Sequence, residues 1–113
     1  MQNVFEIQIT IQNLLDIQVG DNPEYFQKAL WGMVEEAVEA SKEDTRWKAN
    51  DLKLPGYKHK LDKVEKSREL ADVLIQVVNA CIFSDISSEE LMAAVQYKQN
   101  SKLEKFTKLK GEN

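Results

Sequence analysis

Apolar residues recur three and four positions apart along most of the chain, which is the spacing of amphipathic α-helices. This pattern predicts four helices, over about residues 4–19, 23–43, 61–83 and 87–106. Four glycines and two prolines are few helix-breaking residues for a chain of this length. The pattern therefore predicts an all-α fold with one domain over residues 1–113.

Local sequence signals place the ends of the first two helices. Asn3 is a candidate N-cap and Gly20 a candidate C-terminal stop for the first helix. The β-branched residues of this segment would also suit a strand, but its length favours a helix. The second helix has Asp21 or Asn22 as its cap and Pro23 in its first turn, an arrangement typical of helix N-termini.

The remaining boundaries are indicated by a capping box and by turn residues. Ser87 and Glu90 have the spacing at which two side chains satisfy each other's backbone N–H groups, so we expect the fourth helix to begin there. Residues 44–60 are expected to form the main loop. Residues 108–113 are polar and are expected to be a frayed tail.

The net charge of the 113-residue chain is −4, and its sequence pI is about 5.0. Proteins that bind nucleic acids or membrane surfaces usually present a basic face, so this balance argues against both partners. It does not argue against a nucleotide, whose charge a metal ion can neutralise. A domain of this size buries only about two-thirds of its unfolded surface, so we expect it to gain stability by packing against a second copy.

The chain contains a single cysteine, Cys81. No disulfide can form within the chain, and a reducing cytoplasm is the expected location. Cys81 lies on the apolar stripe of its helix, which favours a core residue over a nucleophile. The N-terminus has no signal-peptide pattern, and the longest apolar stretch, over residues 73–78, is far too short to span a bilayer.

Two pairs of carboxylates carry the functional interpretation. Glu36 and Glu39 are three residues apart on the second predicted helix, and Glu69 and Asp72 have the same spacing on the third. Residues three apart lie on nearly the same helix face, so antiparallel packing would bring all four carboxylates together. Their repulsion would be relieved by Mg²⁺, or by Mn²⁺ as a substitute, and Mg²⁺ typically shares its ligands with substrate phosphates.

Other interpretations of these carboxylates remain open at this point. Acidic residues three apart are common on solvated helices. Asp62 and Glu65 also have this spacing, and they precede Glu69 by one to two turns. The spacing alone therefore leaves both a metal site and a solvated face possible.

The segments Leu-Trp-Gly-Met-Val-Glu-Glu-Ala-Val-Glu at 30–39 and Glu-Leu-Ala-Asp-Val-Leu at 69–74 resemble the MazG-like all-α nucleoside triphosphate pyrophosphohydrolases. The signature of this family is Glu-Glu-x-x-Glu on one helix and Glu-x-x-Asp on the next. The resemblance covers roughly residues 26–106. It implies a four-to-five-helix bundle completed by oligomerisation as a homodimer or a homotetramer (a dimer of dimers). It also implies Mg²⁺-dependent cleavage of a (d)NTP to (d)NMP and pyrophosphate. We expect a dNTP as the substrate and the removal of unwanted nucleotides from the cellular pool (house-cleaning) as the purpose.

The resemblance also assigns roles to the acidic residues. Glu36, Glu39, Glu69 and Asp72 match the positions that bind Mg²⁺. Glu35 matches an additional acidic position, and we expect it to position or deprotonate the water that attacks the α phosphorus.

The substrate-binding residues follow from the resemblance less completely. Asn79 matches a polar position on the nucleotide side of the third helix. The family often ends its fourth helix in a Lys…Asn…Arg pattern; here Lys98 and Lys105 align with basic positions, Lys102 stands where Asn is expected, and there is no Arg. Trp47, in the predicted loop, is a candidate for contact with the nucleotide or, equally, an anchor for the loop.

Three alternatives accompany this reading. The chain could instead be a relative of the dimeric dUTPases or of phosphoribosyl-ATP pyrophosphohydrolase, using the same carboxylates with another base pocket. It could also be a non-catalytic helical interaction module whose acidic edges keep it soluble. Such a module would show no dependence on Mg²⁺.

Overall fold

The computed structural model describes residues 1–46 and 61–111, which contain four α-helices and no strand. The helices are α1 (Gln2–Leu14), α2 (Pro23–Ser41), α3 (Lys63–Ile82) and α4 (Ser88–Gly111). The predicted all-α class and the predicted number of helices are confirmed over these residues. Residues 108–111, which we expected to fray, continue α4 as regular helix.

The first helix ends five residues earlier than the sequence predicts. Asp16 adopts a left-handed backbone conformation with φ 57°. The N–H of Ile17 donates to the carbonyl of Gln12 at 2.9 Å, and the N–H of Asp16 donates to that of Asn13 at 3.1 Å. Many helices end with such a left-handed residue just after the last turn, and glycine usually occupies this position. Gly20, the expected stop, lies instead in the connection to α2, with φ 92°.

The predicted N-terminal caps of α2 and α4 are confirmed. The Asn22 side chain accepts a hydrogen bond from the N–H of Tyr25 at 3.3 Å. At the start of α4, the N–H of Ser87 donates to the Glu90 carboxylate and the N–H of Glu90 donates to the Ser87 hydroxyl, both at 3.1 Å. These bonds satisfy N–H groups that a helix cannot pair internally.

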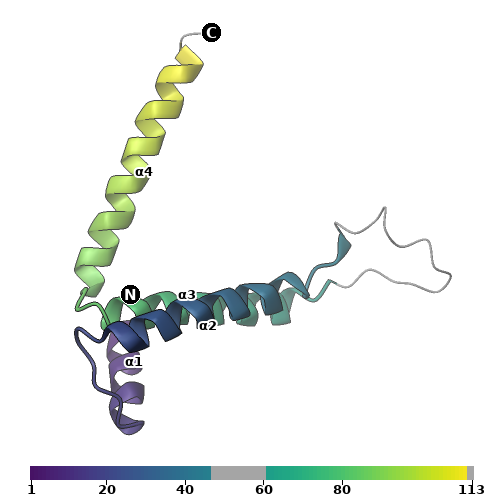
Figure 1. Cartoon of the computed structure of the whole chain (residues 1–113). Helices are drawn as coiled ribbons and strands as arrows, with labels where there is room; N and C mark the ends of the chain where they lie inside the picture. Colours follow the sequence, from purple (N-terminus) through teal and green to yellow (C-terminus); the bar gives the residue numbers. More distant parts are fainter. Residues whose placement is uncertain (47–60, 112–113) are drawn as a thin grey trace, which may run out of the picture.

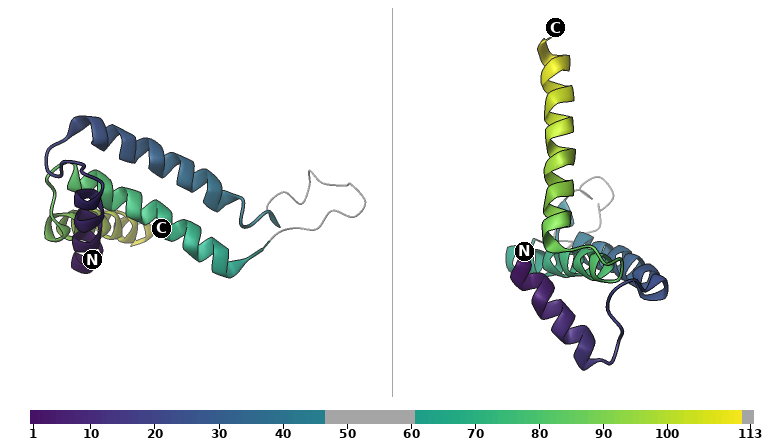
Figure 2. Two further views of the ribbon diagram at one scale, coloured as in Figure 1. Left: turned by 90° about the horizontal axis from the view of Figure 1, so that it is seen from below. Right: turned by 90° about the vertical axis from the view of Figure 1, so that its left-hand side faces the viewer.

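The α2–α3 pair is the centre of the molecule (Figure 1). α1 and α4 leave this pair on opposite sides, and they contact each other only near their first residues (Figure 2). The connection between α1 and α2 is tied to the end of α3, because the N–H groups of Gly20 and Asn22 donate to the carbonyls of Ile82 and Phe83 at 3.2 and 2.9 Å.

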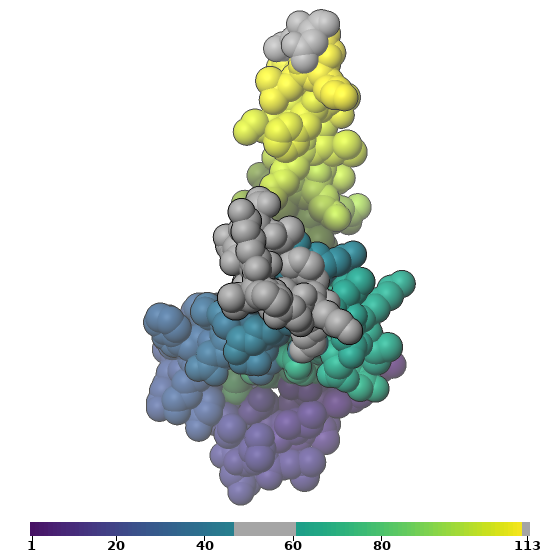
Figure 3. All heavy atoms as spheres, turned by 90° about the vertical axis from the view of Figure 1, so that its right-hand side faces the viewer, coloured from purple at the N-terminus to yellow at the C-terminus, as the bar shows by residue number. Residues whose placement is uncertain are grey.

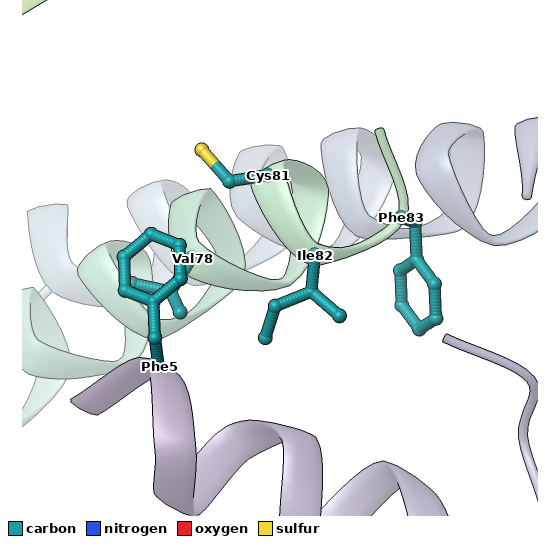
Figure 4. Close-up of a cluster of buried hydrophobic side chains, with 5 residues drawn as sticks. All are labelled: Phe5, Val78, Cys81, Ile82 and Phe83. Carbon is teal, nitrogen blue, oxygen red and sulfur yellow. The ribbon is translucent and has the colours of Figure 1, made fainter. Parts of the chain in front are cut away.

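The buried core is small and lies where α1 crosses the end of α3. It contains Phe5 from α1 and Val78, Cys81, Ile82 and Phe83 from α3 and its end (Figure 4). Val78 is completely buried. The Cys81 side chain points away from α1, and burial raises the pKa of its thiol. These observations confirm Cys81 as a core residue.

Parts of the apolar stripes of the second and third helices are exposed in a single chain. Trp31 is 68% exposed, and Val34, Val38, Leu70 and Leu74 are also exposed. Val78, Cys81 and Ile82 of the stripe on α3 are buried in the core, whereas Leu70 and Leu74 of the same stripe are exposed in one chain.

The fourth helix extends away from the rest of the described chain. Figure 3 shows α4 standing clear of the other helices. The radius of gyration is 18.7 Å, against about 13 Å for a compact domain of this length. Large apolar side chains are also exposed along α4, among them Tyr97, Leu103, Phe106 and Leu109. One chain alone therefore does not form a closed helical bundle.

Candidate metal centre

Three of the four carboxylates predicted to bind a metal come together in the structure. Oxygen atoms of Glu36 on α2 and of Glu69 and Asp72 on α3 all lie within 4.8 Å of one another. Glu36 and Glu69 are half-buried and Asp72 is exposed. Two helices therefore supply a compact set of hard oxygen ligands.

Glu69 is the residue most affected by this clustering. Its pKa is raised, first because the carboxylate is partly desolvated and then because of the negative charges of Asp72 and Glu36. The carboxylates of Glu43 and Glu39 act in the same direction. A bound proton or a bound cation would relieve this repulsion.

Glu39 and Glu35 lie beside this group and not within it. Glu39 is exposed and pairs at 3.1 Å with Lys42, the residue that follows α2. Glu35 is also exposed and precedes Glu36, about 100° around the helix. Neither shares in the three-residue oxygen cluster, so their predicted roles as metal ligand and water-positioning residue stay predictions.

The competing acidic pair has other partners. Asp62 is the N-cap of α3, and its side chain accepts from the N–H of Glu65 at 3.0 Å. The Glu65 carboxylate accepts from the Arg68 guanidinium at 2.6 Å. The spacing that made this pair a rival for the metal site therefore stabilises the beginning of a helix.

A set of cations that sequence reasoning missed lies at the ends of α2 and α3. The Asp44 carboxylate accepts from Arg46 at 2.9 and 2.7 Å and from Lys66 at 2.8 Å. These two partners, Arg46 first, hold the pKa of Asp44 well below its usual range. An isolated bridge between Asp44 and Leu61 joins the two chain segments here.

The lysines predicted to bind the substrate do not reach the carboxylates of their own chain. Lys98, Lys102 and Lys105 are exposed on α4, which leads away from the α2–α3 pair (Figure 1). The sequence suggested one site built from all these residues, whereas the structure separates them within a chain. Trp47 lies outside the described residues.

Asn79 is buried at the centre of a set of amide side chains. Its Oδ1 accepts from Gln8 Nε2 at 3.0 Å and from Gln12 Nε2 at 3.3 Å, and its Nδ2 donates to Gln76 Oε1 at 3.3 Å. Sequence reasoning missed Gln8 and Gln12. Their spacing of four on the side of α1 that also carries Phe5 was the available signal.

The carboxylates and the amides belong to one continuous contact between α2 and α3. On α3 the contact residues Asp72, Gln76, Asn79 and Phe83 are four, three and four positions apart, which keeps them on one face of the helix. On α2, Tyr25, Gly32 and Glu36 are seven and four positions apart and also share a face. The paired positions run antiparallel: Tyr25 with Phe83, Gly32 with Gln76, and Glu36 with Asp72. We call this contact the seam. Its carboxylate end and its amide end are about 10 Å apart, the length of seven residues of helix.

Comparison with protein-family models, with curated proteins and with solved structures gives no match to this chain. The family resemblance therefore rests on its two acidic motifs. No helix within the described residues is long and apolar enough to cross a membrane.

Proposed function

We propose that this protein is a Mg²⁺-dependent nucleoside triphosphate pyrophosphohydrolase, which cleaves a (d)NTP to (d)NMP and pyrophosphate. The observation that carries the proposal is the set of oxygens from Glu36, Glu69 and Asp72, which lie within 4.8 Å of one another. These residues belong to the two motifs that resemble the MazG-like family. The spacing of the motifs and the packing of the helices thus support the same site.

The donor set fits a hard divalent cation. Two oxygens on one Mg²⁺ are separated by at most about 4.2 Å, twice the metal–oxygen distance. The oxygens observed within 4.8 Å need to approach only slightly to reach this limit. Desolvation and then the negative charges of Asp72 and Glu36 raise the pKa of Glu69, and a bound cation would offset this repulsion. Carboxylates also suit Mn²⁺, so Mn²⁺ should substitute.

The proposed roles of the residues follow from their positions. Glu36, Glu69 and Asp72 hold the cation, and Glu39, whose negative charge also acts on Glu69, is a further ligand in this proposal. The cation, when bound, neutralises charge on the triphosphate. Glu35 orients a water and takes its proton as the water oxygen bonds to the α phosphorus. The bond from this phosphorus to the α–β bridging oxygen breaks, and pyrophosphate leaves with the electron pair.

A second copy of the chain completes the site in this proposal. A solitary helix of 24 residues with exposed apolar side chains gains little from its own hydrogen bonds, so α4 needs a partner surface. The exposed stripes of α2 and α3 offer such a surface. Residues 98–111 carry five lysines and one glutamate, while the carboxylate cluster is strongly negative. We therefore propose that α4 of one copy brings Lys98, Lys102 and Lys105 toward the triphosphate bound by another.

The deciding experiment measures pyrophosphate release from the common dNTPs and NTPs, with Mg²⁺ and with EDTA. Wild-type protein should release pyrophosphate only with the metal, and Glu36→Gln should lose at least about 100-fold in kcat/KM. Glu65→Gln is the matched control, because its carboxylate lies on α3 but pairs with Arg68. It should keep normal activity.

The outcomes separate the proposal from a non-catalytic helical module. Full activity of Glu36→Gln would remove this residue from the metal site. No release from any substrate, by folded protein, would overturn the proposed activity. Glu35→Gln should slow turnover while Mg²⁺ still raises the melting temperature, and normal turnover of this variant would exclude Glu35 from the reaction.

A further inference from the structure

The exposed apolar side chains of α4 form a stripe that is symmetric about Gln99. Met92 and Val95 precede Gln99 by seven and four residues, and Leu103 and Phe106 follow it by four and seven. Side chains at these steps lie on one face of an α-helix. The four apolar residues are between 41% and 67% exposed in one chain. The stripe therefore has the same order of apolar positions from either end of the helix.

A stripe with this symmetry is complementary to itself when two copies of α4 lie antiparallel. With Gln99 opposite Gln99 of a second copy, Met92 lies level with Phe106 of that copy, and Val95 lies level with Leu103. Each layer then buries one apolar residue from each helix, as in a two-stranded coiled coil. The two Gln99 amides meet on the twofold axis, where a single polar position in an apolar seam fixes the register.

The charges of α4 favour the antiparallel orientation over the parallel one. Residues 98–111 carry five lysines and one glutamate, whereas the first turn carries Glu89 and Glu90. Within the described residues, no ion pair joins these lysines, or Glu89 and Glu90, to a charge of opposite sign. Parallel pairing would set lysines beside lysines, and like charges at a contact are unfavourable. Antiparallel pairing sets the basic end of each helix beside the acidic start of the other.

A cavity of about 540 Å³ lies where the basic end of the second helix would arrive. It lies between α1 and the start of α4, and its wall combines carboxylates with apolar side chains. The carboxylates are those of Glu6, Asp85, Glu89 and Glu90, and the apolar residues include Phe5, Ile9 and Ile86. A wall of this kind suits lysine side chains, because their apolar stems pack on apolar surface while their charged ends meet carboxylates.

Ser88 joins this cavity to the stripe. It lines the cavity and lies eleven residues, or about three helical turns, before Gln99, so it is on the same face. Ser88 is only 7% exposed, and its hydroxyl has no hydrogen-bond partner among the described residues. Lys110 lies eleven residues after Gln99, so antiparallel pairing places its ammonium, a hydrogen-bond donor, level with Ser88 of the other copy. In one chain the two residues are about 33 Å apart along α4, so only a second copy can bring them together.

We propose that α4 pairs antiparallel with α4 of a second copy of this chain, through the stripe centred on Gln99, and that each basic end is seated in the cavity at the start of the other helix. The pairing rests on α4 and the cavity, and not on the proposed reaction. Lys98, Lys102 and Lys105 lie between about 60° and 120° around the helix from Gln99, on one side of the stripe. The helix can therefore use the stripe for a second α4 and the lysine side for the triphosphate.

Cysteine cross-linking tests the orientation and the register. A disulfide needs two Cβ atoms about 3.8 Å apart, so Gln99→Cys should form a cross-linked dimer under mild oxidation. Met92→Cys and Phe106→Cys should not cross-link alone, because the two copies of either residue lie about 21 Å apart along the helices. A mixture of these two variants should give at least about 10-fold more cross-linked dimer than either alone. Wild-type protein, whose single cysteine is buried, is the control and should give none.

The cross-linking pattern also shows how the proposal would fail. Efficient cross-linking of Met92→Cys alone or Phe106→Cys alone would indicate a parallel pair and overturn the proposal. The absence of cross-linked dimer from both Gln99→Cys and the mixture would overturn it as well, because α4 would then meet some other surface.

Truncation of single side chains tests the stripe without oxidation. Leu103→Ala removes an apolar contact and should raise the dissociation constant, measured by analytical ultracentrifugation, at least about 10-fold. Tyr97→Ala is the matched control, because Tyr97 is 71% exposed but lies about 160° around the helix from Gln99. It should change the constant by less than about 3-fold. Equal effects of the two substitutions, or no effect of Leu103→Ala, would contradict the proposed stripe.

Cross-linking and pyrophosphate release separate failure of the α4 pair from failure of the enzyme. Cross-linking in the expected pattern, without pyrophosphate release from any substrate, would support the pair and overturn the proposed function. Pyrophosphate release by a protein that gives none of the expected cross-links would overturn the pair and leave the proposed reaction standing.

Discussion

Gly32 is the closest point of the seam, and its replacement by alanine tests the packing of α2 on α3. A Cβ built at Gly32 would lie 3.0 Å from Cδ and Nε2 of Gln76, whereas ordinary contacts begin at 3.4 Å. The obstructing atoms belong to a side chain, so Gln76 has to move by at least about 0.4 Å. This movement strains its 3.3 Å hydrogen bond from Asn79.

Two opposing magnitudes determine the stability of Gly32→Ala. Alanine is favoured over glycine within a helix by about 1 kcal/mol. Overpacking a fitted contact costs about 1–3 kcal/mol. The variant should therefore lie between no change and a loss of about 2 kcal/mol in the free energy of unfolding.

A double-mutant cycle with Gln76→Ala separates the two terms. Gln76→Ala removes the three atoms nearest to the new Cβ, which are Cδ, Nε2 and Oε1 of Gln76. In this background Gly32→Ala should stabilise the protein by about 1 kcal/mol, giving a coupling energy of about 1–3 kcal/mol. Urea unfolding at one fixed protein concentration measures all four forms. Equal stabilisation in both backgrounds, with no coupling, would refute the close contact between Gly32 and Gln76.

Two other predictions concern the charge cluster and the uncovered apolar surface. The raised pKa of Glu69 means that, above its ordinary value of 4.5, the folded chain holds more protons than the unfolded chain. The free energy of unfolding in EDTA should therefore fall as the pH rises through this window, and Glu69→Gln should weaken the fall; an identical pH profile for the variant would contradict the assignment. The wild-type chain should be a dimer or tetramer by light scattering, and Leu103→Lys with Phe106→Lys should dissociate it and reduce pyrophosphate release; an active wild-type monomer would exclude the shared site.

The features that the sequence predicted correctly are those that depend on near neighbours in the chain. The caps at Asn22 and at Ser87 with Glu90 join residues three apart. Such contacts form within one helical turn, so they can be recognised without knowing the rest of the fold. The pairing of Glu69 with Asp72 is of the same kind.

Other features depended on contacts distant in the sequence. The buried amides join Gln8 and Gln12 of α1 to Asn79 of α3, about seventy residues later. Asp62 and Glu65 have the same spacing as the clustered carboxylates, but the start of α3 uses them for a cap and an ion pair. Spacing places two side chains on one face, whereas only packing decides what that face meets.

The sequence by itself determined the four helices, the N-terminal caps of α2 and α4 and the two acidic motifs, because each arises from interactions within a few residues. The tertiary structure decided that Glu36 meets Glu69 and Asp72, and that Gly32 of α2 meets Gln76 of α3. It also left Trp31, Val34, Leu70 and Leu74, and much of α4, exposed in one chain. Apolar residues show which faces avoid water, but burial is non-directional and does not specify which surface covers them.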